Sequence, residues 1–217
     1  MCSSDLGVQA KVPILIGSLA NEGYELFPAN GSLTEVQLAE SLNRQFGPAG
    51  ETLMALYADE GSPGGIQHAI ATDLFMTFGM RRWAEYQAAA DVETYLYFMT
   101  HDTPAFHLYM PGSDGLRLPG GPRSAGAYHS GDLAFVFGSI DKVGSEWNDA
   151  DRELSRVMVG YWTNFAKTGS PNGEGLPDWQ PFSPDRHATQ LLGTQSVNST
   201  SGVRREKLDV MAQVYPL

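Results

Sequence analysis

Two short apolar runs mark the strands expected in this chain. Residues 12–17 read Val-Pro-Ile-Leu-Ile-Gly, and residues 94–100 are rich in aromatic and aliphatic side chains. A continuous apolar run of this length is typical of a strand that is buried on both faces, as in a parallel sheet. Residues 190–193 predict a further short strand near the C-terminus.

Helical spacing of apolar residues predicts helices between these strands. The first covers residues 34–46, with Thr34 as its N-cap, and a second short helix covers residues 51–58. Residues 66–90 continue the helical pattern, which Gly79 is expected to bend. Because a long helical stretch separates two buried strands, we expect the strands to lie parallel in one sheet, as in a βαβ unit.

The clearest helical pattern covers residues 148–167. Asn148 or Asp149 is expected to cap its start, and Gly169 ends it. A last helix is expected over residues 204–214. The buried stripe of the long helix is expected to consist of Leu154, Val157, Met158, Tyr161, Trp162 and Phe165.

Composition limits the class of protein. The chain has 217 residues, of which 42% are hydrophobic and 18% charged, so it can bury a core. Its formal net charge of −11 argues against binding to nucleic acid or to an anionic membrane. Cys2 is the single cysteine, which excludes an intrachain disulfide and a thiolate metal cluster. No run approaches the roughly 20 apolar residues of a membrane-spanning helix, and residues 1–7 lack the pattern of a signal peptide.

His129 is the first candidate for chemistry. It lies in a glycine-rich turn within residues 126–138, followed by one or two expected helical turns over residues 132–137. Glycines give such a turn the backbone freedom to orient one side chain, and histidine exchanges a proton near neutral pH. A general base is one interpretation; a satisfied loop histidine is the other.

Glu22 is the second candidate, because it follows the first expected strand directly. In an open parallel sheet, catalytic groups gather at the carboxyl ends of the strands. His129 comes after the second strand, so both side chains are expected at the same edge. A carboxylate that accepts the imidazole N–H fixes its tautomer and leaves the other nitrogen free to take a proton. Taken alone, Glu22 is also compatible with an ordinary loop carboxylate.

Four blocks in one order carry a family resemblance. Residues 14–23 surround Glu22 and residues 126–138 surround His129. The third block is Asp73-Leu74-Phe75 together with Tyr95-Leu96-Tyr97-Phe98. The fourth block is residues 147–179, which include Tyr161-Trp162-Thr163-Asn164-Phe165-Ala166-Lys167-Thr168-Gly169 and Pro171-Asn172-Gly173. Together, from about Gly7 to about Gly193, they resemble the type B carboxylesterases, the family that includes the cholinesterases.

The resemblance implies an α/β fold, the incomplete C-terminal part of an α/β-hydrolase, with a mostly parallel sheet flanked by helices. Residues 1–217 would form one portion of a single hydrolase domain, with residues 1–6 as a non-native start. Glu22 would be the triad acid and His129 the general base. The implied reaction is hydrolysis of a small-molecule carboxylic ester through an acyl-enzyme, with no cofactor and no metal.

The chain lacks two parts of the family's machinery. The Gly-x-Ser-x-Gly elbow that holds the nucleophile, and the oxyanion-hole glycines, precede this region in the family. Ser124 is the nearest lookalike, but Pro122 stands where the elbow needs glycine, and a loop precedes it instead of a strand. The resemblance therefore implies that catalysis needs a missing N-terminal half.

Two other functions stay open. The chain could be a non-catalytic interaction module, since some relatives keep the fold and lose the triad. It could also be an inactive truncated product, whose unpaired strand edges predict poor solubility.

Several neighbouring residues are expected to have structural roles. Asp132 is expected to serve the N-terminus of the short helix instead of pairing with His129. His101 and His107 flank a long loop without metal-ligand spacing. His68 and His187 are expected at the surface. Aromatic core packing is the expected role of Tyr128, Phe135 and Phe137.

Overall fold

The computed structural model describes residues 9–24, 26–105 and 120–216, which form a sheet with helices on both sides. The strands are β1 (Ile14–Leu19), β2 (Thr94–Met99), β3 (Ala188–Leu192) and β4 (Val197–Ser201). The helices are α1 (Glu35–Phe46), α2 (Ala49–Leu56), α3 (Pro63–Thr72), α4 (Phe78–Ala89), α5 (Leu133–Val136), α6 (Asp149–Thr168) and α7 (Arg205–Val214). Shorter helical segments among the described residues are η2 (Ala58–Glu60), η3 (Asp73–Thr77) and η5 (Ile140–Lys142).

The sheet has the order β1-β2-β3-β4. β1 pairs in parallel with β2 along its whole length, with Ile14 opposite Thr94 and Leu19 opposite Met99. β3 is parallel to β2, and β4 is antiparallel to β3. The α/β class and the parallel pairing of the first two strands are therefore confirmed.

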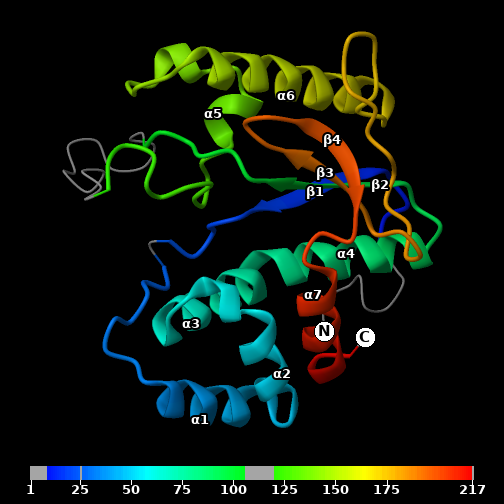
Figure 1. Ribbon diagram of the computed structural model, residues 1–217. Helices are drawn as coiled ribbons and strands as arrows, with labels where there is room; N and C mark the ends of the chain where they lie inside the picture. The colour runs from blue at the N-terminus through cyan, green and yellow to red at the C-terminus, as the bar shows by residue number, and fades with distance from the viewer. Residues whose placement is uncertain (1–8, 25, 106–119, 217) are drawn as a thin grey trace.

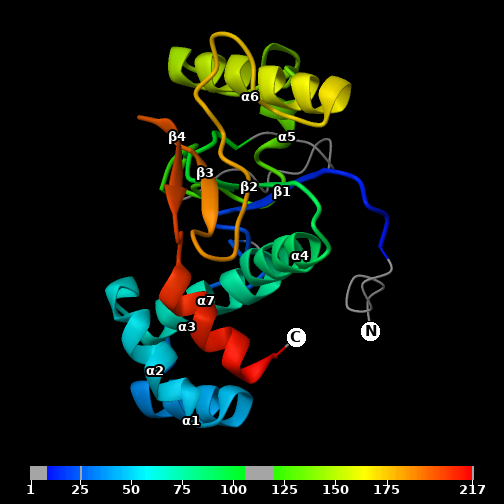
Figure 2. The same ribbon diagram turned by 90° about the vertical axis from the view of Figure 1, so that its right-hand side faces the viewer.

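Helices cover both faces of this sheet. α5 and α6 lie over one face, whereas α4 and α7 lie on the opposite side (Figures 1 and 2). α1, α2 and α3 form a further group beyond the second layer (Figure 1). In the described part of the chain, no helix combines the length and the apolar character needed to cross a membrane.

The core under α6 follows the predicted stripe in part. Leu154, Val157, Met158 and Tyr161 are buried, but Trp162 and Phe165 pack only partly against the same core. α6 begins with a capping box between Asn148 and Asp151, and it ends at Gly169 with φ of 80°. The largest fully buried side chain is that of Trp179, in the loop before β3, whose ring lies edge-on to Tyr161 at 5.0 Å.

The predicted helical stretch 66–90 is interrupted before Gly79 by η3. This segment is π-helical and separates α3 from α4. The Asp73 carboxylate is fully buried and accepts hydrogen bonds from Tyr57 and Arg204, and Thr77 is hydrogen-bonded to Ser18 of β1. Because these contacts hold both ends of η3, tertiary packing fixes the wider π-helical turn.

β1 departs from the predicted two-sided burial. Ile14, Leu15 and Ile16 are only partly buried, whereas Gly17, Ser18 and Leu19 are buried. Among the described strands, β1 borders only β2, so one of its edges has no neighbour.

The Trp179 position yields a prediction for stability. We expect Trp179→Ala to lower the free energy of unfolding by about 3–5 kcal/mol, because the indole is fully buried in the α6 core. Urea unfolding monitored by circular dichroism measures the change. Trp83→Ala is the matched control, since Trp83 is 43% exposed and its removal should cost clearly less than that of Trp179. Equal costs for the two variants would contradict this assignment of the core.

Candidate active site

Glu22 lies in the turn that follows β1. Its side chain folds back toward the strand, and Oε1 accepts a hydrogen bond from the Leu19 N–H at 2.8 Å. The residue is only 2% exposed. Burial raises the pKa of Glu22, while the hydrogen bonds from His129 and Leu19 oppose that rise. The carboxylate is thus held in one orientation by the end of its own strand.

Asn21, the neighbour of Glu22, holds the loop that carries His129. The Asn21 N–H donates to the Ala127 carbonyl at 2.9 Å, and the Ala127 N–H donates to Asn21 Oδ1 at 3.0 Å. Asn21 and Tyr128 also form an isolated parallel bridge. Two adjacent residues after β1 therefore fix both the loop and its histidine.

The structure brings the two predicted side chains together. Glu22 Oε2 lies 2.6 Å from His129 Nδ1. A carboxylate is an acceptor, so Nδ1 carries the proton and Nε2 of the neutral ring is left as the acceptor. Despite this contact, 48% of the His129 side chain is exposed. The expectation that both residues meet at one edge of the sheet is confirmed.

Local backbone geometry presents the imidazole outward. Ser130 has φ of 67°, so the chain reverses directly after His129, and the Gly131 N–H closes the turn on the Tyr128 carbonyl at 2.9 Å. The ring of Phe75 lies edge-on to the His129 ring with centroids 5.7 Å apart. An imidazole fixed at Nδ1 and accessible elsewhere can accept a proton from a bound nucleophile.

Asp132 does not have its predicted role. It occupies the N-cap position of α5, but its side chain makes no capping hydrogen bond. Its carboxylate instead accepts from the Tyr97 hydroxyl of β2 at 2.9 Å, and burial raises the pKa of Asp132. The Tyr97 ring crosses β1 at Gly17, where a Cβ would lie 2.4 Å from the ring. Packing across the sheet therefore determines where this carboxylate points.

A second histidine–carboxylate pair, which the sequence pattern did not reveal, supports the His129 loop. His101 Nε2 lies 2.5 Å from Asp151 Oδ1, and its Nδ1 lies 2.9 Å from the Thr194 hydroxyl. His101 is 1% exposed. Both ring nitrogens are engaged and buried, so this pair is structural.

Arg123 joins that pair to the loop. It donates to both carboxylate oxygens of Asp151, at 3.0 and 2.5 Å. It also donates to the Asp102 carbonyl at 2.6 Å and to the Glu146 carbonyl at 3.0 Å. Burial of Asp151 opposes its ionisation, but the hydrogen bonds from Arg123, from the Asn148 backbone and from His101 together lower its pKa. The loop that leads to His129 is thereby clamped to the start of α6.

The remaining predicted residues lie away from the Glu22–His129 contact. Ser124 is an exposed loop serine whose hydroxyl donates to the Gly121 carbonyl at 2.9 Å. Phe135 is fully buried, as predicted, whereas Phe137 is 76% exposed, so its predicted core role is wrong. His187 is also buried, against Phe182, and not at the surface.

Cys2 and His107 lie outside the described residues. Within those residues, no three His, Cys, Asp or Glu side chains are grouped to hold a metal ion.

Comparison with known proteins places these observations in a family. The model of the carboxylesterase family matches residues 7–211. The chain belongs to the carboxylesterase family. Among curated relatives, carboxylesterase 4A of Bos taurus is 34% identical over 139 residues, which cover 64% of this chain and 22% of that protein. Bile salt-activated lipase of Homo sapiens is 31% identical over 116 residues, 50% of this chain and 14% of that lipase.

Solved carboxylesterase structures share the fold. A carboxylesterase of Geobacillus stearothermophilus superposes with a TM-score of 0.73 at 23% identity, covering 96% of this chain and 42% of that enzyme. A thermophilic PNB esterase gives a TM-score of 0.67 at 25% identity, covering 95% and 40%. This carboxylesterase chain thus spans less than half the length of the relatives and structures described here.

The contact between Asn21 and the His129 loop yields a prediction. Gly126 has φ of 65°, and a Cβ there would lie 2.3 Å from Asn21 Oδ1. We expect Gly126→Ala to lower the free energy of unfolding by about 1–3 kcal/mol more than Gly121→Ala does. Gly121 is the matched control, because it also has a positive φ but open space around its Cα. Equal losses in urea unfolding would show that Asn21 does not constrain this loop.

The Asp151 network yields a prediction with a pH dependence. A carboxylate whose pKa is lowered by folding adds stability above its ordinary pKa of 3.8, and that stability is lost as the pH falls through the lower folded value. We expect Asp151→Asn to cost about 3–5 kcal/mol at neutral pH, because it leaves Arg123 poorly paired, and to remove this acid-dependent component.

Urea unfolding at neutral pH and at decreasing acidic pH values tests both parts. Asp149→Asn is the control, since Asp149 is in the same helical turn but fully exposed. Its stability and its pH dependence should match those of the unsubstituted protein within about 0.5 kcal/mol. An Asp151→Asn variant that behaves like this control would contradict the clamp.

Proposed function

We propose that Glu22 and His129 are the acid and the general base of a serine esterase that cleaves carboxylic esters. The observation that carries this proposal is the contact of 2.6 Å between Glu22 Oε2 and His129 Nδ1, with the imidazole half exposed. Membership of the carboxylesterase family supports the same reaction class. The substrate is a small-molecule carboxylic ester, and the reaction needs no cofactor.

In the proposed reaction, His129 Nε2 takes the proton of a serine hydroxyl as the serine oxygen attacks the ester carbonyl. Glu22 stabilises the imidazolium that forms. The same proton then passes to the alkoxy leaving group as the C–O bond breaks, which gives the alcohol and an acyl-serine. In the second half, His129 takes a proton from water, hydroxide attacks the acyl carbonyl, and the serine recovers its proton as the acid leaves.

The serine and the oxyanion hole are proposed to come from sequence upstream of this chain. Residues 1–217 would then be the C-terminal portion of one hydrolase domain. Among the described strands, β1 has an unpaired edge beside Glu22, and a strand that carries the serine would fit there. Such a strand would deliver its side chain to the carboxyl edge where His129 lies. We call this chain together with its upstream sequence the full-length enzyme.

The proposal predicts the effect of two substitutions in the full-length enzyme. We expect His129→Ala to lower kcat for phenyl acetate by roughly 10⁴–10⁶-fold, because triad members act as a unit. Glu22→Gln should lower kcat by about 10⁴-fold, since an amide donor facing Nδ1 forces the proton onto Nε2 and blocks the base. Steady-state hydrolysis measures both changes.

His101→Gln is the matched control, because His101 also pairs with a carboxylate but is fully buried. It should lower the melting temperature and keep kcat within about tenfold of the unsubstituted enzyme, whereas His129→Ala should abolish the activity of protein that is still folded. Full activity of His129→Ala would contradict the esterase assignment. A full-length protein that lacks esterase activity altogether would favour a non-catalytic interaction module.

A further inference from the structure

The turn at residues 18–23, which carries the proposed acid, packs against α3 and η3. The Ser18 hydroxyl donates to Thr77 Oγ1 of η3 at 3.2 Å. A Cβ on Gly23 would clash with the Thr72 hydroxyl at the end of α3, so no larger residue fits there without a shift. The turn therefore lies directly on these two helical segments at both of its ends.

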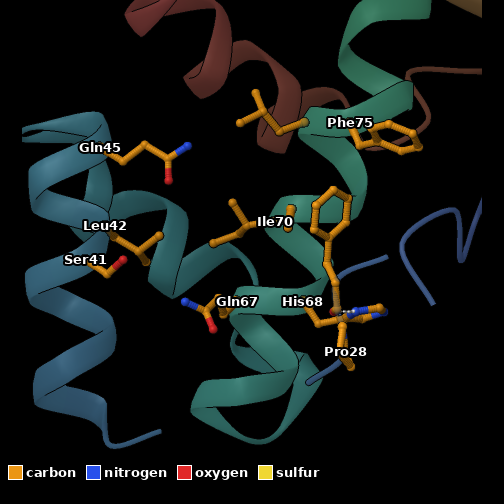
Figure 3. A pocket seen from close by; sticks show the side chains of 11 residues that line it. Pro28, Ser41, Leu42, Gln45, Gln67, His68, Ile70 and Phe75 are labelled. Carbon is orange, nitrogen blue, oxygen red and sulfur yellow. Dashed lines mark hydrogen bonds between the residues drawn. The ribbon is translucent and has the colours of Figure 1, made fainter. Parts of the chain in front are cut away.

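The same two segments also contact the chain after this turn and the imidazole. His68 of α3 (Figure 3) donates from Nδ1 to the Phe27 carbonyl at 2.6 Å. Phe75 of η3 lies farther along the same helical run (Figure 3), and its ring centroid is 5.7 Å from that of His129. A shift of η3 would therefore change the surroundings of the acid and of the base together.

Arg204, the residue before α7, joins η3 to the turn. Its guanidinium pairs with the fully buried Asp73 carboxylate, and its Nη2 donates to the Ala20 carbonyl at 3.4 Å. The guanidinium also lies over the Phe98 ring of β2, 5.1 Å from the ring centroid. Because Ala20 is two residues before Glu22, one side chain links the last helix, η3 and the proposed acid.

The backbone of Arg204 has an unfavourable conformation. Its φ of 52° and ψ of 26° lie in the left-handed region, which residues other than glycine rarely adopt. Such a conformation persists only where the surrounding contacts determine it. The side chain is 21% exposed, and its contacts with Asp73 and Ala20 supply that constraint.

Arg81 of α4 provides a comparison with an ordinary ion pair. It also bonds to α7, through the Asp209 carboxylate and the Arg205 carbonyl. Neither partner belongs to the turn at residues 18–23. Arg81 thus holds α7 against α4, whereas Arg204 holds the start of α7 against the turn that carries the acid.

We propose that Arg204 is a positioning residue for the reaction, which fixes the turn at residues 18–23 so that the Glu22 carboxylate meets His129 Nδ1. This inference rests on the proposed function, and it makes the docking of α7 a condition for catalysis. Arginine fits the role because its planar fork donates to a carboxylate and to a carbonyl at once, whereas lysine donates from a single nitrogen.

Arg204→Lys in the full-length enzyme tests this role, because it keeps the charge beside Asp73 but loses the fork. We expect kcat for phenyl acetate to fall about 10–100-fold with KM within about threefold, since a misplacement of about 1 Å costs about 10²-fold. The ¹H–¹⁵N signal of His129 Nδ1–H should broaden or vanish, because a weakened bond to Glu22 exposes that proton to exchange with water. Asp73→Asn removes the charge that orients Arg204 and should have the same effects, which keeps the test valid if one variant does not fold.

Arg81→Lys is the matched control, since it also replaces a buried arginine that bonds to α7. It should lower the melting temperature but keep kcat within about threefold and the His129 signal unchanged. If folded Arg204→Lys or Asp73→Asn behaves like this control, or loses kcat with an unchanged His129 signal, the positioning role is overturned. If His129→Ala stays active, the esterase proposal has failed on its own, and the His129 signal still decides whether Arg204 fixes the contact.

Discussion

The buried Glu22 carboxylate is the constraint on which the rest of the site depends. It is 2% exposed, and both of its oxygens have partners: the Leu19 N–H on one side and His129 Nδ1 on the other. A carboxylate in such surroundings costs free energy unless its hydrogen bonds are complete. The end of β1 and the His129 loop must therefore keep their relative positions. Asn21 holds them there through its two hydrogen bonds to Ala127.

The wider fold also holds Glu22 and His129 close together. The parallel pairing of β1 with β2 brings the two strand ends to one edge of the sheet. From β2, the chain enters the loop that Arg123 clamps to Asp151 at the start of α6. α6 is in turn held on the sheet by a core that includes Tyr161 and Trp179. Packing far from His129 thus limits how far its loop can move.

Local patterns predicted much of this arrangement. β1, β2 and α6 are long and apolar enough to be predicted from sequence. Because Glu22 follows the first of these parallel strands and His129 follows the second, both were expected at one edge of the sheet. β4 was missed because Val197–Ser201 is mostly polar and pairs only at the side of the sheet. The π-helical segment η3 was missed because the contacts that fix it, Arg204 with Asp73 among them, join distant parts of the chain. The His101–Asp151–Arg123 network has no sequence signature for the same reason.

Glu22 fixes the tautomer of His129, and ¹⁵N NMR of histidine-labelled protein tests this role directly. We expect His129 to carry its proton on Nδ1, and we expect Glu22→Gln to move that proton to Nε2. His101 is an internal reference, because its contact with Asp151 predicts a proton on Nε2 in both proteins. A His129 ring protonated on Nε2 in the unsubstituted protein, or a tautomer that is unchanged by Glu22→Gln, would show that Glu22 does not fix the imidazole.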